Sequence, residues 1–120
     1  MSSYRPERVA GQIHKVISEL LLSGGIKDPR VALVTLTEVQ VTRDLRLARV
    51  YYTVLGSDEE KAEAAEGLAR VSSFVRRSLG QEIRLRHIPE LRFEYDSSAD
   101  TGRRIDELLR NAKIGTEDAE

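Results

Sequence analysis

Arginine is the residue type whose number and spacing in this sequence suggest a chemical role. Six arginines fall within the 23 residues from 70 to 92: Arg70, Arg76, Arg77, Arg84, Arg86 and Arg92. A guanidinium group pairs bidentately with phosphate and stacks on unpaired bases, which suits structured RNA. Arg70 and Arg77 would share one face of an unbroken helix. The cluster therefore favours an RNA partner, and the open alternative is a solvated exterior paired with Glu66, Glu82 and Glu90.

The remaining reactive side chains form no recognisable catalytic or metal-binding motif. The chain has no cysteine, which excludes thiolate catalysis, disulfides and cysteine-ligated zinc. His14 and His87 are its only histidines, and they lie far apart in the sequence. Ser72 and Ser73 lack the G-x-S-x-G elbow that presents a serine nucleophile. We therefore expect a protein that is not an enzyme and has no metal or other cofactor.

Length and composition are those of one globular domain. The chain has 120 residues, of which 40% are hydrophobic and 32% charged, enough for one core and too few for two. It has no apolar run of membrane-spanning length and no hydrophobic signal core, so we expect a cytoplasmic protein. The net charge of −1 is unevenly distributed, because residues 58–66 and 111–120 are acidic and the rest carries an excess of five positive charges. Such a body is compatible with a nucleic-acid partner.

The first half of the chain has the pattern of a helix followed by a β-hairpin. Apolar residues recur at helical spacing through residues 5–22, and the run stops at Ser23-Gly24-Gly25. Pro29 excludes Asp28 from the helical region, which predicts a turn at residues 27–30. Residues 31–41 and 45–55 are rich in β-branched side chains and are separated by a turn at residues 42–44. We therefore expect two antiparallel strands.

The second half has the pattern of two helices and a third strand. Ser57 or Asp58 can cap a helix that runs to about residue 71. Ser72 and Ser73 are indifferent helix formers and predict a bend before a second helix, which ends near residue 83. Residues 91–95 alternate as a strand, and a short helix is expected at residues 105–109. The order α-β-β-α-α-β predicts an α+β fold, with helices covering one face of a three-stranded sheet. We expect a domain over residues 1–110 and a flexible acidic tail over residues 111–120.

Four segments, in combination and in order, resemble a known family. They are RPERVAGQIHKVISELL, IKDPR, VTLTEVQVTRDLRLARVYYTVL and FVRRSLGQEIRLRHIPELRFEYDSS. Together they resemble the ribosome-binding factor A family over about residues 5–110. The resemblance implies a single type II KH-like domain that acts as a monomeric, cytoplasmic and non-enzymatic ribosome assembly factor. It further implies binding to the free 30S small ribosomal subunit and help in maturing the 5′ end region of 16S rRNA.

The sequence departs from the family at the expected bend between the two helices. Where the family has an Ala-x-Gly bend, the corresponding residues here are Val71, Ser72 and Ser73. A residue with a Cβ resists the left-handed dihedrals that glycine adopts. The serine in place of glycine therefore affects how sharply the chain bends here. It also affects how closely the backbone can approach RNA.

We expect the RNA-binding surface at this bend, where a new helix start would offer free backbone amides to phosphate. The expected contacts are Arg70, Ser72, Ser73, Arg76, Arg77, Arg84 and Arg86, with a second set, Lys27, Arg30, Arg43 and Arg46, flanking the first hairpin. A different function stays open, in which a KH-like module docks on protein through the exposed edge of its sheet without contacting RNA. Steeply salt-dependent binding would separate the two, because it marks phosphate contacts.

Overall fold

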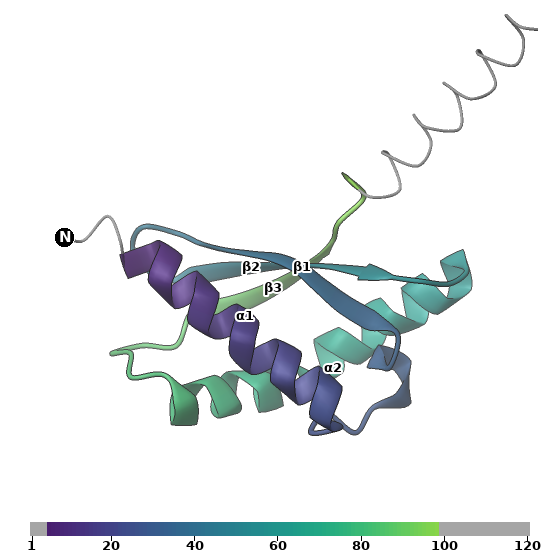
Figure 1. Cartoon of the computed structure of the whole chain (residues 1–120), viewed down its shortest axis with the longest axis horizontal. Coiled ribbons are helices and arrows are strands. Elements are labelled where there is room, and N and C mark those ends of the chain that lie inside the picture. Colours follow the sequence, from purple (N-terminus) through teal and green to yellow (C-terminus); the bar gives the residue numbers. More distant parts are fainter. Residues whose placement is uncertain (1–4, 99–120) are drawn as a thin grey trace, which may run out of the picture.

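Two helices lie on the same side of a three-stranded sheet (Figure 1). The computed structural model describes residues 5–98. Its elements follow the order α1 (Arg5–Ser23), η2 (Pro29–Val31), β1 (Val34–Val41), β2 (Leu47–Val54), α2 (Asp58–Glu82) and β3 (Glu90–Tyr95). The strand order is β1-β2-β3, with β1 antiparallel and β3 parallel to the central β2. The expected α+β class, with helices on one face of the sheet, is confirmed. The short helix expected at residues 105–109 and the acidic tail at residues 111–120 lie outside the described residues.

Helix α1, Arg5–Ser23, buries a single apolar stripe and ends at the predicted glycines. Its buried side chains, Val9, Ile13 and Ile17, recur every four residues and therefore line one face. Gly24 takes a φ of +74°, and the N–H of Gly25 donates to the carbonyl of Leu20 at 3.0 Å. The left-handed conformation of Gly24 thus lets the N–H of Gly25 bind a carbonyl that the helix end leaves free. The apolar face of α1 packs mainly on β1.

The turn after α1 is longer than the sequence pattern predicts. Residues Pro29–Val31 form a short 3-10 helix, η2, so the first strand begins at Val34 and not at residue 31. The Asp28 side chain caps η2 by accepting from the backbone N–H of Arg30 at 3.0 Å. Pro29 occupies the first helical position, where its fixed φ and missing N–H are tolerated. The cap holds residues 29–31 in helical dihedrals, so β1, the strand that pairs with β2, begins later in the sequence than predicted.

Strands β1, Val34–Val41, and β2, Leu47–Val54, form the predicted antiparallel hairpin. Their register shifts between Leu36 and Glu38, because Thr37 is an extra residue in β1. The shift explains the burial of Leu36 together with Val39, which strict alternation would place on opposite faces.

The turn that joins these strands covers residues 42–46, wider than the predicted 42–44. The Asp44 carboxylate accepts from the Thr42 hydroxyl at 2.6 Å and from the backbone N–H of Arg46 at 3.1 Å. The Thr42 bond, and then the Arg46 bond, lower the pKa of Asp44 below its ordinary value. Leu45 has a φ of +62°, an uncommon conformation for a residue with a Cβ. The carboxylate therefore fixes a turn whose backbone is strained.

Helix α2, Asp58–Glu82, is one unbroken helix, so the predicted helix end at about residue 71 and the predicted start of a second helix after Ser72 and Ser73 are wrong. One stripe of buried or half-buried apolar residues continues on both sides of the two serines: Ala64, Leu68, Val71, Val75 and Leu79. A single packing surface therefore holds both halves of the helix. A serine costs a helix only about 0.5 kcal/mol relative to alanine, and no glycine is present at the serines to take a left-handed kink. The packing outweighs the weak local preference.

The N-terminal end of α2 is fixed by a local capping box and by one contact to β3. Ser57 accepts from the N–H of Glu60, and the Glu60 carboxylate accepts from the N–H of Ser57, each at 3.1 Å. This is a capping box, which confirms the expectation that Ser57 or Asp58 begins the helix. Farther along, the Lys61 ammonium lies 5.0 Å from the ring centre of Tyr95. The helix is thereby tied to the end of β3.

Strand β3, Glu90–Tyr95, lies beside β2, close to its predicted bounds. Its inward side chains pack with the core, as expected from their alternation: Leu91, Phe93 and Tyr95. The ring of Tyr95 meets that of Tyr52 edge to face at 5.7 Å. The alternate positions of the two strands, among them Tyr51 and Arg92, therefore face away from the helices.

Candidate nucleic-acid interface

The continuity of α2 places Arg70 and Arg77 on one exposed face of the helix. Phe74 lies between them, four residues after the first and three before the second. Its side chain is 38% exposed, although an apolar residue in an amphipathic helix is expected to face the core. The sequence pattern counts Phe74 among the apolar residues of the expected second helix and gives it no role in binding. The signal that identifies it is its place between two arginines on a helix face, which becomes visible only once the helix is known to be unbroken.

An open hollow lies between this face of α2 and the loop that leads into η2. Its volume is about 820 Å³, and its wall consists of residues 25–30 with Arg70, Val71 and Phe74. Three cationic side chains, Lys27, Arg30 and Arg70, belong to this wall together with one carboxylate, Asp28. The structure therefore joins Arg70 to two residues that were expected in a separate set.

Within this wall Arg30 is bound by the carboxylate of its own turn. Its Nε donates to Oδ1 of Asp28 at 2.9 Å and its Nη2 donates to Oδ2 at 2.6 Å. Its Nη1 lies 3.7 Å from the Glu66 carboxylate. The hydrogen bond between the two side chains lowers the pKa of Asp28 to about 2 and raises the pKa of Arg30. Lys27 and Arg70 have no ion pair within residues 5–98, so they are the cations of the hollow that are open to a ligand.

A second hollow, of about 520 Å³, lies on α2 closer to its C-terminal end. It is lined by Ser73, Arg76, Arg77, Gly80 and Ile88. Nη2 of Arg76 donates to the backbone carbonyl of Ile88 at 3.1 Å, which fastens the following loop to the helix. Arg77 has no ion pair among the described residues. The two hollows share the arginine-bearing part of α2.

The helix start expected at Ser72 and Ser73 does not exist, so the prediction that free amides there bind phosphate is wrong. Inside a continuous helix each amide donates to the carbonyl four residues earlier. Ser72 is half-buried, whereas Ser73 is exposed and lines the second hollow. This position therefore offers a ligand the hydroxyl of Ser73 and no free backbone amide.

The hairpin turn lies far from these hollows. Arg43 and Arg46 follow β1, whereas Lys27 and Arg30 precede it. A strand of eight residues spans about 26 Å. The predicted second set is therefore split between the two ends of the hairpin.

Arg84 and Arg86, both exposed, lie near the turn end of the hairpin. The loop that carries them leads into β3, whose first N–H, from Glu90, donates to the carbonyl of Arg46 at 2.8 Å. Arg84 also lines a hollow of about 630 Å³ with Arg5 and Arg8 of α1, two residues that the sequence pattern did not single out. The predicted site residues thus form two groups, one beside η2 and α2 and one around the hairpin turn.

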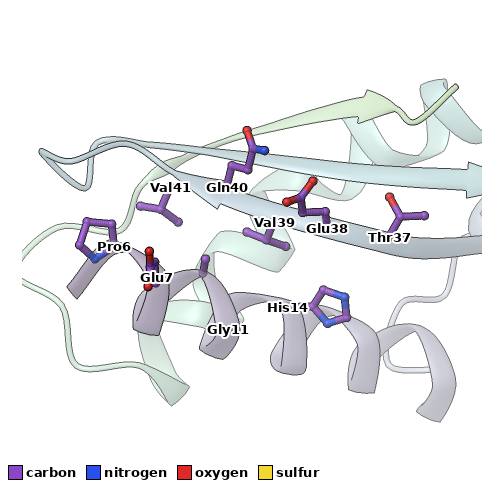
Figure 2. A pocket seen from close by; sticks show the side chains of 10 residues that line it. Pro6, Glu7, Gly11, His14, Thr37, Glu38, Val39, Gln40 and Val41 are labelled. Atoms are coloured by element: carbon purple, nitrogen blue, oxygen red, sulfur yellow. The ribbon is translucent and has the colours of Figure 1, made fainter. Parts of the chain in front are cut away.

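A narrower groove separates α1 from the outer edge of β1 (Figure 2). It has a volume of about 460 Å³ and is lined from Pro6 to His14 on the helix and from Thr37 to Val41 on the strand. The side chains of Val39 and Val41 point toward the helix, whereas Gln40 points away from it (Figure 2). In the described part of the chain β1 is an edge strand, so its outer backbone groups have no neighbouring strand. The groove is therefore a place where an extended segment can add to the sheet.

Residues 5–98 contain no group of three or more histidine or acidic side chains that could hold a metal ion. No helix in that range is both long enough and apolar enough to cross a membrane.

Three comparisons relate the chain to known proteins. The family model of ribosome-binding factor A matches residues 5–109. Ribosome-binding factor A of Geobacter sulfurreducens is 48% identical over 106 residues, which cover 88% of this chain and 89% of that protein. Many further curated relatives of the same name match, among them that of Citrifermentans bemidjiense at 46% identity over 95% of this chain and 93% of its own.

Solved structures share the fold. The crystal structure of ribosome-binding factor A from Thermus thermophilus superposes with a TM-score of 0.65 at 23% identity, covering 75% of this chain and 93% of that one. A Thermus thermophilus homology model fitted into the cryo-EM map of a 30S–RbfA complex has a TM-score of 0.60 at 24% identity, covering 73% and 91%. Because the family model matches residues 5–109, which are most of the chain, the chain belongs to the ribosome-binding factor A family.

Proposed function

We propose that this chain is a ribosome assembly factor that binds the free 30S small ribosomal subunit. The observation that carries the proposal is the family match over residues 5–109. A Thermus thermophilus member with the same fold has been fitted into the map of a complex with the 30S subunit. We infer that this chain occupies its subunit as a monomer in the cytoplasm.

The surface of α2 supplies a physical basis for contact with rRNA. Arg70 and Arg77 are exposed on one helix face and have no ion pair among the described residues. Lys27 and Arg70 both line the larger hollow, Lys27 from the loop before η2 and Arg70 from α2. Cations that are not neutralised by their own chain can replace the counterions of phosphates, which is the main source of affinity for nucleic acid.

We further propose that binding helps the 5′ end region of 16S rRNA to mature. A protein that binds one conformation of an RNA more tightly than another shifts the population toward the bound form. Such a factor favours maturation without performing a chemical step itself. In this proposal the nuclease that trims the RNA is a separate protein.

Fractionation on sucrose gradients tests the proposal. The tagged chain, expressed in place of the native factor, is expected to sediment with free small subunits and to be depleted from translating ribosomes. Cells without it are expected to accumulate 16S rRNA with an unprocessed 5′ end. Equal occupancy of free subunits and polysomes would contradict the assembly role, and a normal 5′ end in depleted cells would contradict the maturation role.

The groove between α1 and β1 favours one competing function, docking on a protein through the sheet edge. Gly11 lines this groove, and a Cβ there would meet no atom within 4 Å. Gly11→Tyr therefore places a ring in the groove while the helix is kept. If the edge of β1 is the contact, this variant loses binding to the small subunit and the wild-type chain binds with little salt dependence. If rRNA phosphates are the contact, Gly11→Tyr binds normally and binding falls steeply with salt.

A further inference from the structure

Phe74 is an exposed aromatic ring in positively charged surroundings. With Arg70 and Val71 it forms the α2 side of the larger hollow, and the loop containing Lys27 forms the opposite side. A ring on an amphipathic helix is normally covered by the core, yet 38% of this side chain is open to solvent. The hollow therefore combines a flat apolar surface with cations on both sides.

The wall of this hollow is held in place by close packing and by the Asp28–Arg30 pair. A Cβ on Gly67 would come within 3.0 Å of both the Arg30 Cβ and the Val31 Cγ1, so α2 and η2 approach as closely as a glycine permits. The bidentate bond from Arg30 to Asp28 fixes the turn that carries Lys27. A site with a preformed wall loses less entropy when a ligand binds.

The chemistry of the hollow fits one class of occupant. Three cations against one carboxylate favour a polyanion. A phosphate alone would not use the ring, and an aliphatic side chain would not use the cations. A nucleotide with an unpaired base uses both, because the base stacks on an aromatic ring while its phosphates meet Lys and Arg.

We propose that an unpaired base of small-subunit rRNA stacks on Phe74, with its flanking phosphates bound by Lys27 and Arg70. The inference rests on the proposed function, since it names the part of the rRNA that this surface receives. It assigns Phe74 the role of a stacking residue. It also separates the two groups of arginines, because within residues 5–98 the hollow beside η2 has an aromatic ring in its wall and the hollow that Arg84 lines has none.

Fluorescence gives a direct test, because the chain contains no tryptophan. Phe74→Trp introduces a single indole at the site, and Tyr51→Trp introduces one on the opposite face of the sheet as a matched control. A short single-stranded RNA of mixed sequence is expected to quench the indole at position 74 and to leave that at position 51 unchanged. The same RNA with abasic sugars in place of its bases is expected to bind without quenching. Failure of the intact RNA to quench the Phe74→Trp indole would overturn the inference.

Affinity for the small subunit gives a second test that separates stacking from simple apolar contact. Phe74→Ala and Phe74→Leu are expected to weaken cosedimentation with 30S subunits about tenfold, the typical contribution of one stacked base, and Phe74→Tyr is expected to retain it. Leu22→Ala, at a side chain that is 89% exposed, is the matched control and is expected to have no effect. Full binding by Phe74→Leu would overturn stacking and indicate that the hollow receives an aliphatic side chain of a protein.

The two proposals fail in different ways. If the wild-type chain cosediments with small subunits while Phe74→Ala binds equally well, only the stacking inference fails. If the wild-type chain does not associate with small subunits at all, the proposed function fails, whatever the fluorescence experiment shows.

Discussion

The Asp28 carboxylate accepts three hydrogen bonds from Arg30, two from the guanidinium group and one from the backbone N–H. Two residues separated by a single proline thus form a closed unit, in which the same carboxylate caps η2 and neutralises the arginine. The sequence pattern predicts an Arg30 that is available to RNA. The structure pairs this arginine with Asp28, a partner only two residues away, so Arg30 also shapes the loop, and its contact with RNA stays a prediction.

The stability that Asp28 contributes depends on pH. Its pKa falls from the ordinary 3.8 to about 2 in the folded chain, chiefly because the Arg30 side chain donates to it. A depressed pKa means that the stabilisation is complete above the unfolded pKa and is lost as the pH falls through the folded one. Asp28→Asn should therefore melt at a lower temperature than wild type at neutral pH, and the difference should shrink between about pH 4 and pH 2. Thermal melts followed by circular dichroism across this range measure it.

Glu66→Gln is the control for this variant. Its carboxylate lies 3.7 Å from Arg30 and its side chain is 75% exposed, so its removal should change the melting temperature much less. A difference between Asp28→Asn and wild type that stayed constant down to pH 2 would show that the charge of Asp28 is not the cause.

Among the elements, α2 shows how tertiary packing determines the course of a helix. Because Ser73 lies inside the helix and is exposed, its contribution should follow intrinsic helix propensity. Ser73→Ala should raise the free energy of unfolding by about 0.5 kcal/mol, and Ser73→Gly should lower it by about the same amount. Urea denaturation measures both changes. A gain in stability with glycine would mean that residue 73 has a left-handed conformation and that the helix bends there.

The spacing of the elements predicts opposite effects at two helical glycines. At Gly11 a Cβ meets nothing within 4 Å, so Gly11→Ala should stabilise the fold by roughly 0.5–1 kcal/mol. At Gly67 a Cβ would press on Arg30 and Val31 at 3.0 Å, and Gly67→Ala should destabilise it by pushing η2 away from α2. Chemical denaturation of the two variants in parallel gives the comparison. Equal gains at both positions would show that η2 yields easily to the added methyl group.

For the whole molecule, the distribution of arginines is the property that bears on function. One group lies beside η2 and on α2, and the other lies around the hairpin turn, at the far end of β1. If the group on α2 contacts rRNA, Arg70→Ala with Arg77→Ala should reduce the magnitude of the salt slope of 30S binding by about two. Titrations at several salt concentrations measure the slope, and circular dichroism verifies that the fold is kept.

Two further variants make this result interpretable. Arg92→Ala removes an exposed arginine from the opposite face of the sheet and should leave the slope unchanged. Arg43→Ala with Arg46→Ala removes the pair at the hairpin turn. A slope that responds to this pair and not to the pair on α2 would place the rRNA contact at the other end of the molecule.

The elements whose signals are local could be predicted from the amino-acid sequence. The glycines after α1 predicted where that helix ends, and the capping residues before α2 predicted where that helix begins. The alternation of β3 predicted which of its side chains face the core. These features depend on hydrogen bonds and dihedral preferences within a few residues, so they do not need the rest of the fold. The family followed from the order of short motifs in the same way.

Features that depend on partners distant in sequence emerged only from the folded chain. Ser72 and Ser73 predicted a bend, yet the core holds one apolar stripe on both sides of them and keeps α2 continuous through the serines. That continuity places Phe74 between Arg70 and Arg77 on one helix face, and the fold brings Phe74 and Arg70 to the loop of Lys27. No local preference contains this information, because the burial free energy of a long helix face exceeds the few tenths of a kcal/mol by which each serine differs from a good helix former.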